Sequence, residues 1–151
     1  MIPQEYILPV IISNLVAIVL ILTAIKWPRA TRWIFSLIFL PAGIFNAYTA
    51  LTDPQVYVEG YAQLAIPLYH DFILGFFSQH TTLIVLAIAS GQLLAGLFLA
   101  LQRPFFDLGV IGGIVFLLAI APLGVGSAFP ATLLMAAGLL VLHQRLRIWQ
   151  Q

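Results

Sequence analysis

Five long apolar segments determine what this chain can fold into. They fall at residues 5–25, 31–51, 81–101, 104–121 and 131–149. A helix needs roughly 20 largely apolar residues to cross the hydrocarbon core of a bilayer, which is about 30 Å thick. Backbone amides in lipid must be hydrogen-bonded within their own segment. Spans this close together therefore predict an all-α fold, an integral membrane helical bundle with five transmembrane helices.

Composition supports this class and excludes others. The chain is 62% hydrophobic and 7% charged, with a mean hydropathy of +1.08, whereas soluble domains carry about 25% charged residues. Its 151 residues allow one domain, so we interpret 1–151 as a single transmembrane domain in a lipid bilayer. The sequence offers no basic face for nucleic acid. The absence of cysteine excludes a disulfide, a thiolate nucleophile and an iron–sulfur cluster within the chain.

Charge predicts the orientation. With the sides numbered alternately along the five segments, all six basic residues fall on one side: Lys26, Arg29, Arg32, Arg103, Arg145 and Arg147. Four of the five acidic residues fall on the other side: Glu5, Asp53, Glu59 and Asp71. The positive-inside rule therefore predicts an external N-terminus and a cytoplasmic C-terminus. A signal peptide carries positive charge before its apolar stretch, whereas the first segment here has Glu5 at its start and Lys26 after it. We therefore expect this span to be retained.

The connection 53–80 concentrates the polar groups of the chain. It holds two of the three histidines, three of the five tyrosines and three of the five acidic residues, and it has no Lys or Arg. Five apolar residues within it fall on one helical stripe: Tyr69, Phe72, Ile73, Phe76 and Phe77. We therefore expect an outer amphipathic or re-entrant cap at 53–80 that is helical in part. The pattern also allows the third transmembrane helix to start well before Thr81.

Three runs carry a family resemblance: RWIFSLIFLPAGIFNAY, SGQLLAGLFLAL and APLGVGSAFPATLL. With them the chain resembles the DoxX-like superfamily of small bacterial integral membrane proteins over roughly residues 32–142. The resemblance implies a four-helix core in the bacterial inner membrane, to which the N-terminal helix is added. Some members are linked with quinone-dependent oxidation of sulfur compounds or with maturation of redox enzymes in the cell envelope. The resemblance carries no catalytic residue onto this chain.

Side-chain amides inside the spans mark a candidate site. Asn46 lies in the outer half of the second segment and Gln92 near the middle of the third. An unpaired amide costs about 4–8 kcal/mol on water-to-alkane scales, so each needs a partner. Two interpretations stay open. The amides form hydrogen bonds between helices, worth about 0.6 kcal/mol per contact, or they line a ligand cavity roofed by 53–80.

For the cavity interpretation, we place four ligand-binding candidates at its mouth: Tyr61, Tyr69, His70 and Asp71. The alternative for His70 and Asp71 is a solvated polar edge at the membrane surface. Haem is not expected, because His143 falls at the cytoplasmic end and the other two histidines fall outside. His70, Asp71 and His80 are residue types that bind metals, but their spacing matches no recognised site, so no metal is predicted.

Gly109 and Gly113 form a GxxxG pattern in the fourth segment, which allows a neighbouring helix to approach closely. The pattern predicts a packing face. It leaves open whether that face meets the same chain, another membrane protein or a second copy in a homo-oligomer.

These features favour a protein that binds an apolar or amphipathic ligand, quinone- or lipid-like, as an accessory to a redox or envelope process. The alternatives are a purely structural or assembly subunit without a ligand site, and a small transporter. Transporters usually carry charges near the bilayer midplane, and this sequence has none there. An enzyme is the weakest interpretation, because no activated nucleophile and hence no catalytic residue can be identified. The sequence does not determine the ligand, a cofactor or the oligomeric state.

Overall fold

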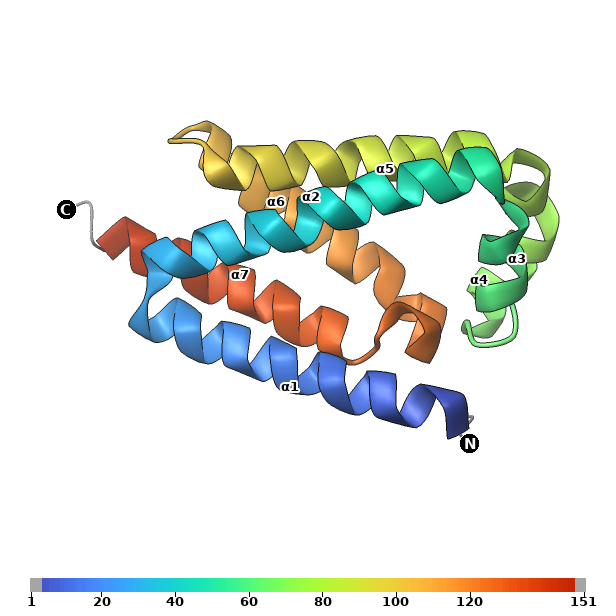
Figure 1. Ribbon diagram of the computed structural model, residues 1–151, viewed down its shortest axis with the longest axis horizontal. Coiled ribbons are helices and arrows are strands. Elements are labelled where there is room, and N and C mark those ends of the chain that lie inside the picture. The colour runs from blue at the N-terminus through green and yellow to red at the C-terminus, as the bar shows by residue number, and fades with distance from the viewer. Residues whose placement is uncertain (1–3, 149–151) are drawn as a thin grey trace.

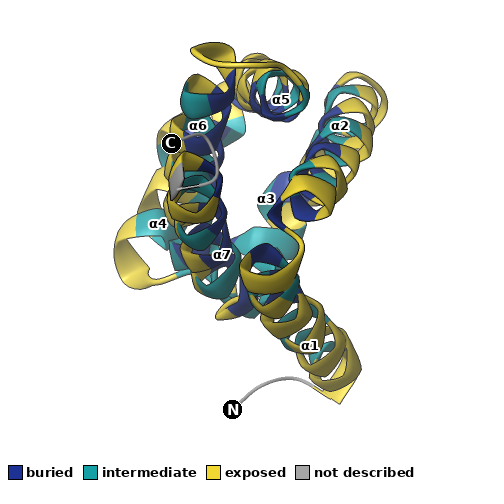
Figure 2. Ribbon diagram, turned by 90° about the vertical axis from the view of Figure 1, so that its left-hand side faces the viewer, coloured by how far each residue is buried: buried dark blue, intermediate teal, exposed yellow. Residues whose placement is uncertain are grey.

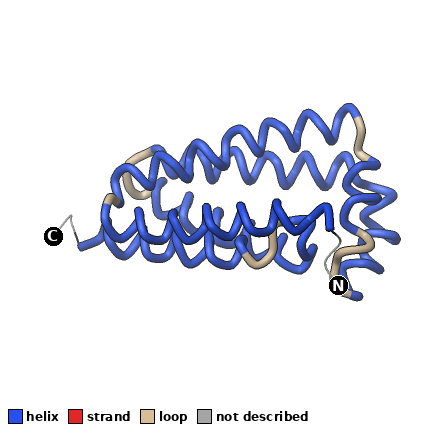
Figure 3. Tube along the Cα trace, turned by 60° about the horizontal axis from the view of Figure 1, so that its bottom comes forward, coloured by secondary structure: helices blue, strands red, loops and turns tan. Residues whose placement is uncertain are grey.

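The computed structural model describes residues 4–148, and every regular element in that part of the chain is helical (Figure 3). The all-α prediction is therefore confirmed. The long helices are α1 (Gln4–Lys26), α2 (Pro28–Thr52), α5 (Ser78–Ala100), α6 (Phe105–Ile120) and α7 (Ala131–Ile148). Successive long helices run in opposite directions, so α1 begins and α7 ends at opposite ends of the bundle (Figure 1).

Within residues 4–148, four stretches are long and apolar enough to cross a membrane: Gln4–Lys26, Pro28–Thr52, Pro67–Ala100 and Phe105–Ser127. By length and composition, the chain is thus a multi-pass membrane protein with its apolar helices in a lipid bilayer. The fifth predicted segment corresponds to α7, which is not among these four. Trp149, the predicted end of that segment, lies outside the described residues.

Prolines explain two differences between predicted and observed boundaries. Pro28 ends α1, as predicted, but it also begins α2, because its fixed φ suits the first turn of a helix. Pro67 begins α4 (Pro67–Phe72), which continues through a π-helical turn, η1 (Ile73–Phe77), into α5. The third helix therefore starts before Thr81. Gly75 interrupts the turn with φ −92° and ψ −105°.

The connection between α2 and α5 lies at the end of the bundle where α1 begins. There α3 (Gln55–Tyr61) and α4 stand beside η2 (Ala121–Ser127), the 3₁₀ turn between α6 and α7 (Figure 1). Ile66 N donates to Pro122 O at 3.0 Å. Gly124 has φ +76° and lies against Leu64 O, where a Cβ would collide with the carbonyl. The prediction that 53–80 is helical in part is confirmed, and the segment packs on the α6–α7 turn.

Two apolar clusters form the interior. The larger one lies towards the end where α7 finishes and includes Phe35, Phe39, Leu99, Leu139 and Leu142. The second lies near α3 and includes Ala50, Tyr57, Ile73, Phe77 and Val85. Exposed apolar side chains cover the outer faces, above all on α1 (Figure 2). This is the pattern expected of helices whose outer faces meet lipid.

The GxxxG pattern packs within the chain. A Cβ on Gly109 would lie 2.6 Å from Leu99 N of α5, and one on Gly113 would lie 2.8 Å from Leu139 Cδ1 of α7. Both glycines are buried. The predicted packing role is therefore confirmed inside the bundle. A contact of this face with a partner or a second copy is not supported, because α5 and α7 already cover it.

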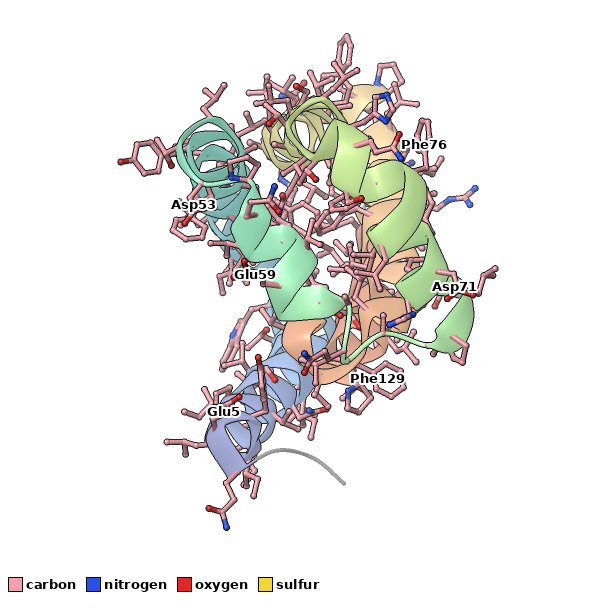
Figure 4. All side chains as sticks on the ribbon, turned by 90° about the vertical axis from the view of Figure 1, so that its right-hand side faces the viewer. Glu5, Asp53, Glu59, Asp71, Phe76 and Phe129 are labelled. Carbon is pink, nitrogen blue, oxygen red and sulfur yellow. The ribbon has the colours of Figure 1, made fainter. Side chains whose placement is uncertain are left out.

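The charges separate to the two ends of the bundle. The basic residues of the α1–α2 connection, the α5–α6 connection and the last turn of α7 share one end, called here the basic end. Glu5, Asp53, Glu59 and Asp71 are spread over the opposite end, called here the acidic end, which faces the viewer in Figure 4. Asp107 stays at the basic end, where its Oδ1 lies 3.3 Å from Arg103 Nε and 3.0 Å from His143 Nε2.

Candidate functional site

A cavity of about 870 Å³ lies in the half of the bundle towards the acidic end. Its walls come from α2, α3, α4, η1, α5, α6 and η2. The apolar part of the lining includes Phe72, Phe77, Ile84, Ile88, Val115 and Phe116, and the polar part is Asn46, Tyr57, Tyr61, Tyr69, Gln92 and Ser127. Ligand pockets in proteins typically have a volume in this range and a mostly apolar lining with a few polar groups.

Asn46 and Gln92 meet inside the bundle. Asn46 Nδ2 donates to Gln92 Oε1 at 2.8 Å, so the two amides join α2 to α5. Both side chains also line the cavity. The sequence left open whether these amides join helices or line a ligand cavity. The geometry is compatible with both, because the same two residues bridge α2 and α5 and face the cavity.

Tyr57 completes this polar array. From α3 its hydroxyl donates to Asn46 Oδ1 at 2.9 Å and lies 3.2 Å from Asn46 O. Both the Nδ2 donor and the Oδ1 acceptor of Asn46 are thus hydrogen-bonded within the chain. Gln92 is 5% exposed, and its Nε2 donates to no residue within 4–148 although the side chain lines the cavity. Gln92 therefore has hydrogen-bond donors available for a ligand.

Tyr61 and Tyr69, two of the ligand-binding candidates, are among the residues that line the cavity. Tyr61 stacks on Tyr57 with ring centroids 6.2 Å apart. Tyr69 spans from α4 to α6, where its hydroxyl donates to Ala119 O at 3.0 Å. Burial raises the pKa of the Tyr61 hydroxyl above its ordinary value of 10.0, and the nearby phenols of Tyr57 and Tyr6 raise it further. Tyr61 is therefore a neutral group at physiological pH.

His70 and Asp71, the other two ligand-binding candidates, lie on α4. Neither lines the cavity. His70 Nδ1 is 3.1 Å from Asp71 Oδ1 on the outside of α4, and the Asp71 side chain is 84% exposed. Sequence neighbours on a helix point about 100° apart and rarely meet, yet here the flexible side chains do. His80 Nδ1 contacts Phe76 O of its own helix at 3.0 Å, so the histidines of this region do not converge on one point.

Sequence reasoning missed Tyr57 and the whole α6 wall. Tyr57 precedes Tyr61 by four residues, a spacing that places both on one helical face, so the signal was present. The α6 wall gave no such signal. Val115, Phe116 and Ala119 are apolar or small residues in an apolar helix, and those facing a cavity have the same composition as those facing lipid.

Removing the Tyr57 hydroxyl tests the polar array. Tyr57→Phe leaves Asn46 Oδ1 without a donor among the described residues, and a buried unsatisfied acceptor costs about 1–3 kcal/mol. We expect a loss of unfolding free energy in this range, measured by denaturant titration in detergent micelles. Tyr48→Phe is the matched control, because Tyr48 is 65% exposed. Equal effects of the two substitutions would contradict the array.

Comparisons of the chain with protein-family models, with curated proteins and with solved structures find no match.

Proposed function

We propose that this chain is a bacterial inner-membrane protein that binds a small apolar or amphipathic molecule, quinone- or lipid-like, beneath an outer cap. In this role it serves a redox or envelope process as an accessory component. The observation that carries the proposal is the cavity of about 870 Å³ with Gln92 and Asn46 on its wall. Polar residues within spans face protein interiors or functional cavities more often than lipid.

The proposal includes five spans, with α7 as the fifth. Support comes from its position: α7 packs against α1 and α6, which both belong to candidate spans. Arg145 and Arg147 stand in its last turn, where long basic side chains extend to the membrane surface. In the proposed cap, Leu68 and Phe72 are exposed and apolar while Asp71 is exposed and charged. Such a segment suits the interface between lipid and water.

Reporter fusions test the topology. We expect green fluorescent protein fused after Gln151 to fluoresce in the cytoplasm and alkaline phosphatase inserted near Glu59 to be active outside. The reason is that all six basic residues lie at one end of the bundle. An insertion after Arg103 is the control and is expected to report the cytoplasm. Finding Glu59 and Gln151 on the same side would overturn the five-span arrangement.

Leucine substitutions test ligand binding. Asn46→Leu and Gln92→Leu replace the two amides by an apolar side chain and so remove these polar groups from the cavity wall. We expect Gln92→Leu to weaken binding of decyl-ubiquinone or monooleoylglycerol about tenfold or more, since a hydrogen bond from its free donors to a ligand is worth about 1.5 kcal/mol. Asn46→Leu removes the partner that orients the Gln92 amide and is expected to weaken binding in the same direction. Native mass spectrometry of the detergent-purified chain measures this.

Ser90→Ala is the control for these variants. Ser90 Oγ donates to Leu86 O of its own helix at 2.8 Å, and Ser90 does not line the cavity. Its substitution should leave binding unchanged. If Asn46→Leu and Gln92→Leu keep their bound probe and change only thermal stability, the amides serve helix association and the structural-subunit alternative replaces the proposed function.

The resemblance to the DoxX-like superfamily stays a prediction, and it agrees with the proposal without carrying it. A small transporter is less well supported, because no charged side chain from residues 4–148 lines the cavity.

A further inference from the structure

Towards the acidic end α6 diverges from α5 (Figure 1), and we interpret the exposed cavity-lining residues on both helices as an opening of the cavity between them. The two helices touch towards the basic end, where Gly109 meets Leu99 and a Cβ on Gly112 would meet Ala95 at 3.5 Å. Beyond that point they separate. Gly91 has nothing within 4 Å of an added Cβ, although it lines the cavity.

Exposed residues mark the two sides of this opening, called here the α5–α6 portal. Ile88 and Gly91 of α5 face it from one side, and Val115 and Ala119 of α6 face it from the other. Val115 lines the cavity and is 61% exposed, which fits a position at the rim of such an opening. In the proposed five-span arrangement this part of α5 and α6 lies within the hydrocarbon layer, so the portal would connect the cavity with the bilayer and not with water.

The distribution of charge restricts what can use the portal. No charged side chain from residues 4–148 lines the cavity. All six basic residues of the chain lie at the opposite end, and the connection 53–80 beside the cavity carries Asp53, Glu59 and Asp71 with no Lys or Arg. An anionic head group would leave water without gaining a cation and would meet like charges, both of which oppose binding.

The available polar groups indicate what the head of the ligand must offer. Gln92 Nε2 provides N–H donors that no described residue uses, whereas the Tyr57 hydroxyl and both ends of the Asn46 amide are already engaged. The complementary group is an uncharged acceptor such as a carbonyl or ester oxygen. The apolar walls and the portal then accommodate a hydrocarbon chain.

We infer that the cavity takes an uncharged, chain-bearing lipid from the outer leaflet through the α5–α6 portal, with its acceptor oxygen on Gln92 and without accepting anionic phospholipids. This inference rests on the proposed function and narrows its ligand class and route.

Photolabelling in nanodiscs tests it, with two probes that carry the same diazirine-modified acyl chain: a monoacylglycerol and a phosphatidylglycerol. We expect the monoacylglycerol to label cavity residues and the phosphatidylglycerol to label them at least about tenfold less, a difference equivalent to about 1.4 kcal/mol. Mass spectrometry of peptides locates the label.

A second test blocks the portal with Val115→Trp, which places a large side chain at its rim. Ile111→Trp is the matched control, because Ile111 is also exposed on α6, one helical turn away, and does not line the cavity. We expect Val115→Trp to slow uptake of the monoacylglycerol about tenfold or more and Ile111→Trp to leave it unchanged.

The outcomes distinguish a failure of this inference from a failure of the proposed function. Equal cavity labelling by both probes would overturn the exclusion of anionic lipids, and unchanged uptake in Val115→Trp would overturn the portal. Either result leaves the proposed function standing if Gln92→Leu still abolishes labelling. Absence of cavity labelling by both probes in the unmodified chain would overturn the inference and the proposed function together.

Discussion

Replacing Gly109 by alanine is expected to destabilise the bundle by about 1–3 kcal/mol or more, the usual range for overpacking a tight interior contact. The added methyl group would lie 2.6 Å from Leu99 N and 2.9 Å from the Phe98 carbonyl carbon. Both atoms belong to the backbone of α5, so no side-chain rotation relieves the clash and the two helices must separate. Denaturant titration or thermal unfolding in micelles measures the loss.

Two glycines of the same region serve as controls. Gly91→Ala meets no atom within 4 Å and exchanges glycine for the best helix former, so we expect a gain of up to about 1 kcal/mol. Gly112→Ala makes only an ordinary contact with Ala95 at 3.5 Å and should be close to neutral. If Gly109→Ala and Gly91→Ala changed stability alike, the close approach of α5 and α6 at Gly109 would be wrong.

Filling the cavity from Gly91 is expected to abolish ligand binding without unfolding the protein. In Gly91→Leu the new side chain has open space around its Cβ and occupies part of the cavity that Gly91 lines. We expect binding of decyl-ubiquinone or monooleoylglycerol to fall by at least about a hundredfold, equivalent to about 2.8 kcal/mol. Native mass spectrometry and thermal unfolding of the same sample report binding and folding together.

Gly60→Leu is the matched substitution outside the site. A Cβ on Gly60 of α3 also meets nothing within 4 Å, and Gly60 does not line the cavity. Binding should stay unchanged in this variant. A Gly91→Leu protein that still retains its probe would show that the ligand lies elsewhere.

The long helices and the separation of charge could be predicted from the sequence, because apolar length and the placement of Lys and Arg depend on the bilayer and not on details of packing. The start of α5 could not. A helical pattern continues from α4 to α5, and only the three-dimensional contacts show that η1 joins them with a distortion at Gly75. Boundaries at prolines were equally ambiguous, since one proline can end a helix and begin the next.

The site was predictable where a residue type is out of place in its surroundings. Asn46 and Gln92 are amides in apolar helices, and the structure places both on the cavity wall. His70 and Asp71 drew attention for their chemistry, but the face they occupy depends on how α4 joins α5 through a π-helical turn. A π turn holds more residues than an α turn and so changes which side chains point inward. Sequence periodicity counted at 3.6 residues per turn cannot register that change.

The packing of α1 chiefly against α7 has a consequence for biosynthesis. During translation α1 leaves the ribosome long before α7, and contacts between segments far apart in sequence form late. The small-residue face of α1 at Ala17 and Ala24, buried in the finished protein, thus faces lipid or the insertion machinery while α2, α5 and α6 associate. Completion of α7 is then the event that supplies α1 with its principal partner, and a nascent chain stalled before Ala131 holds α1 at the membrane without it.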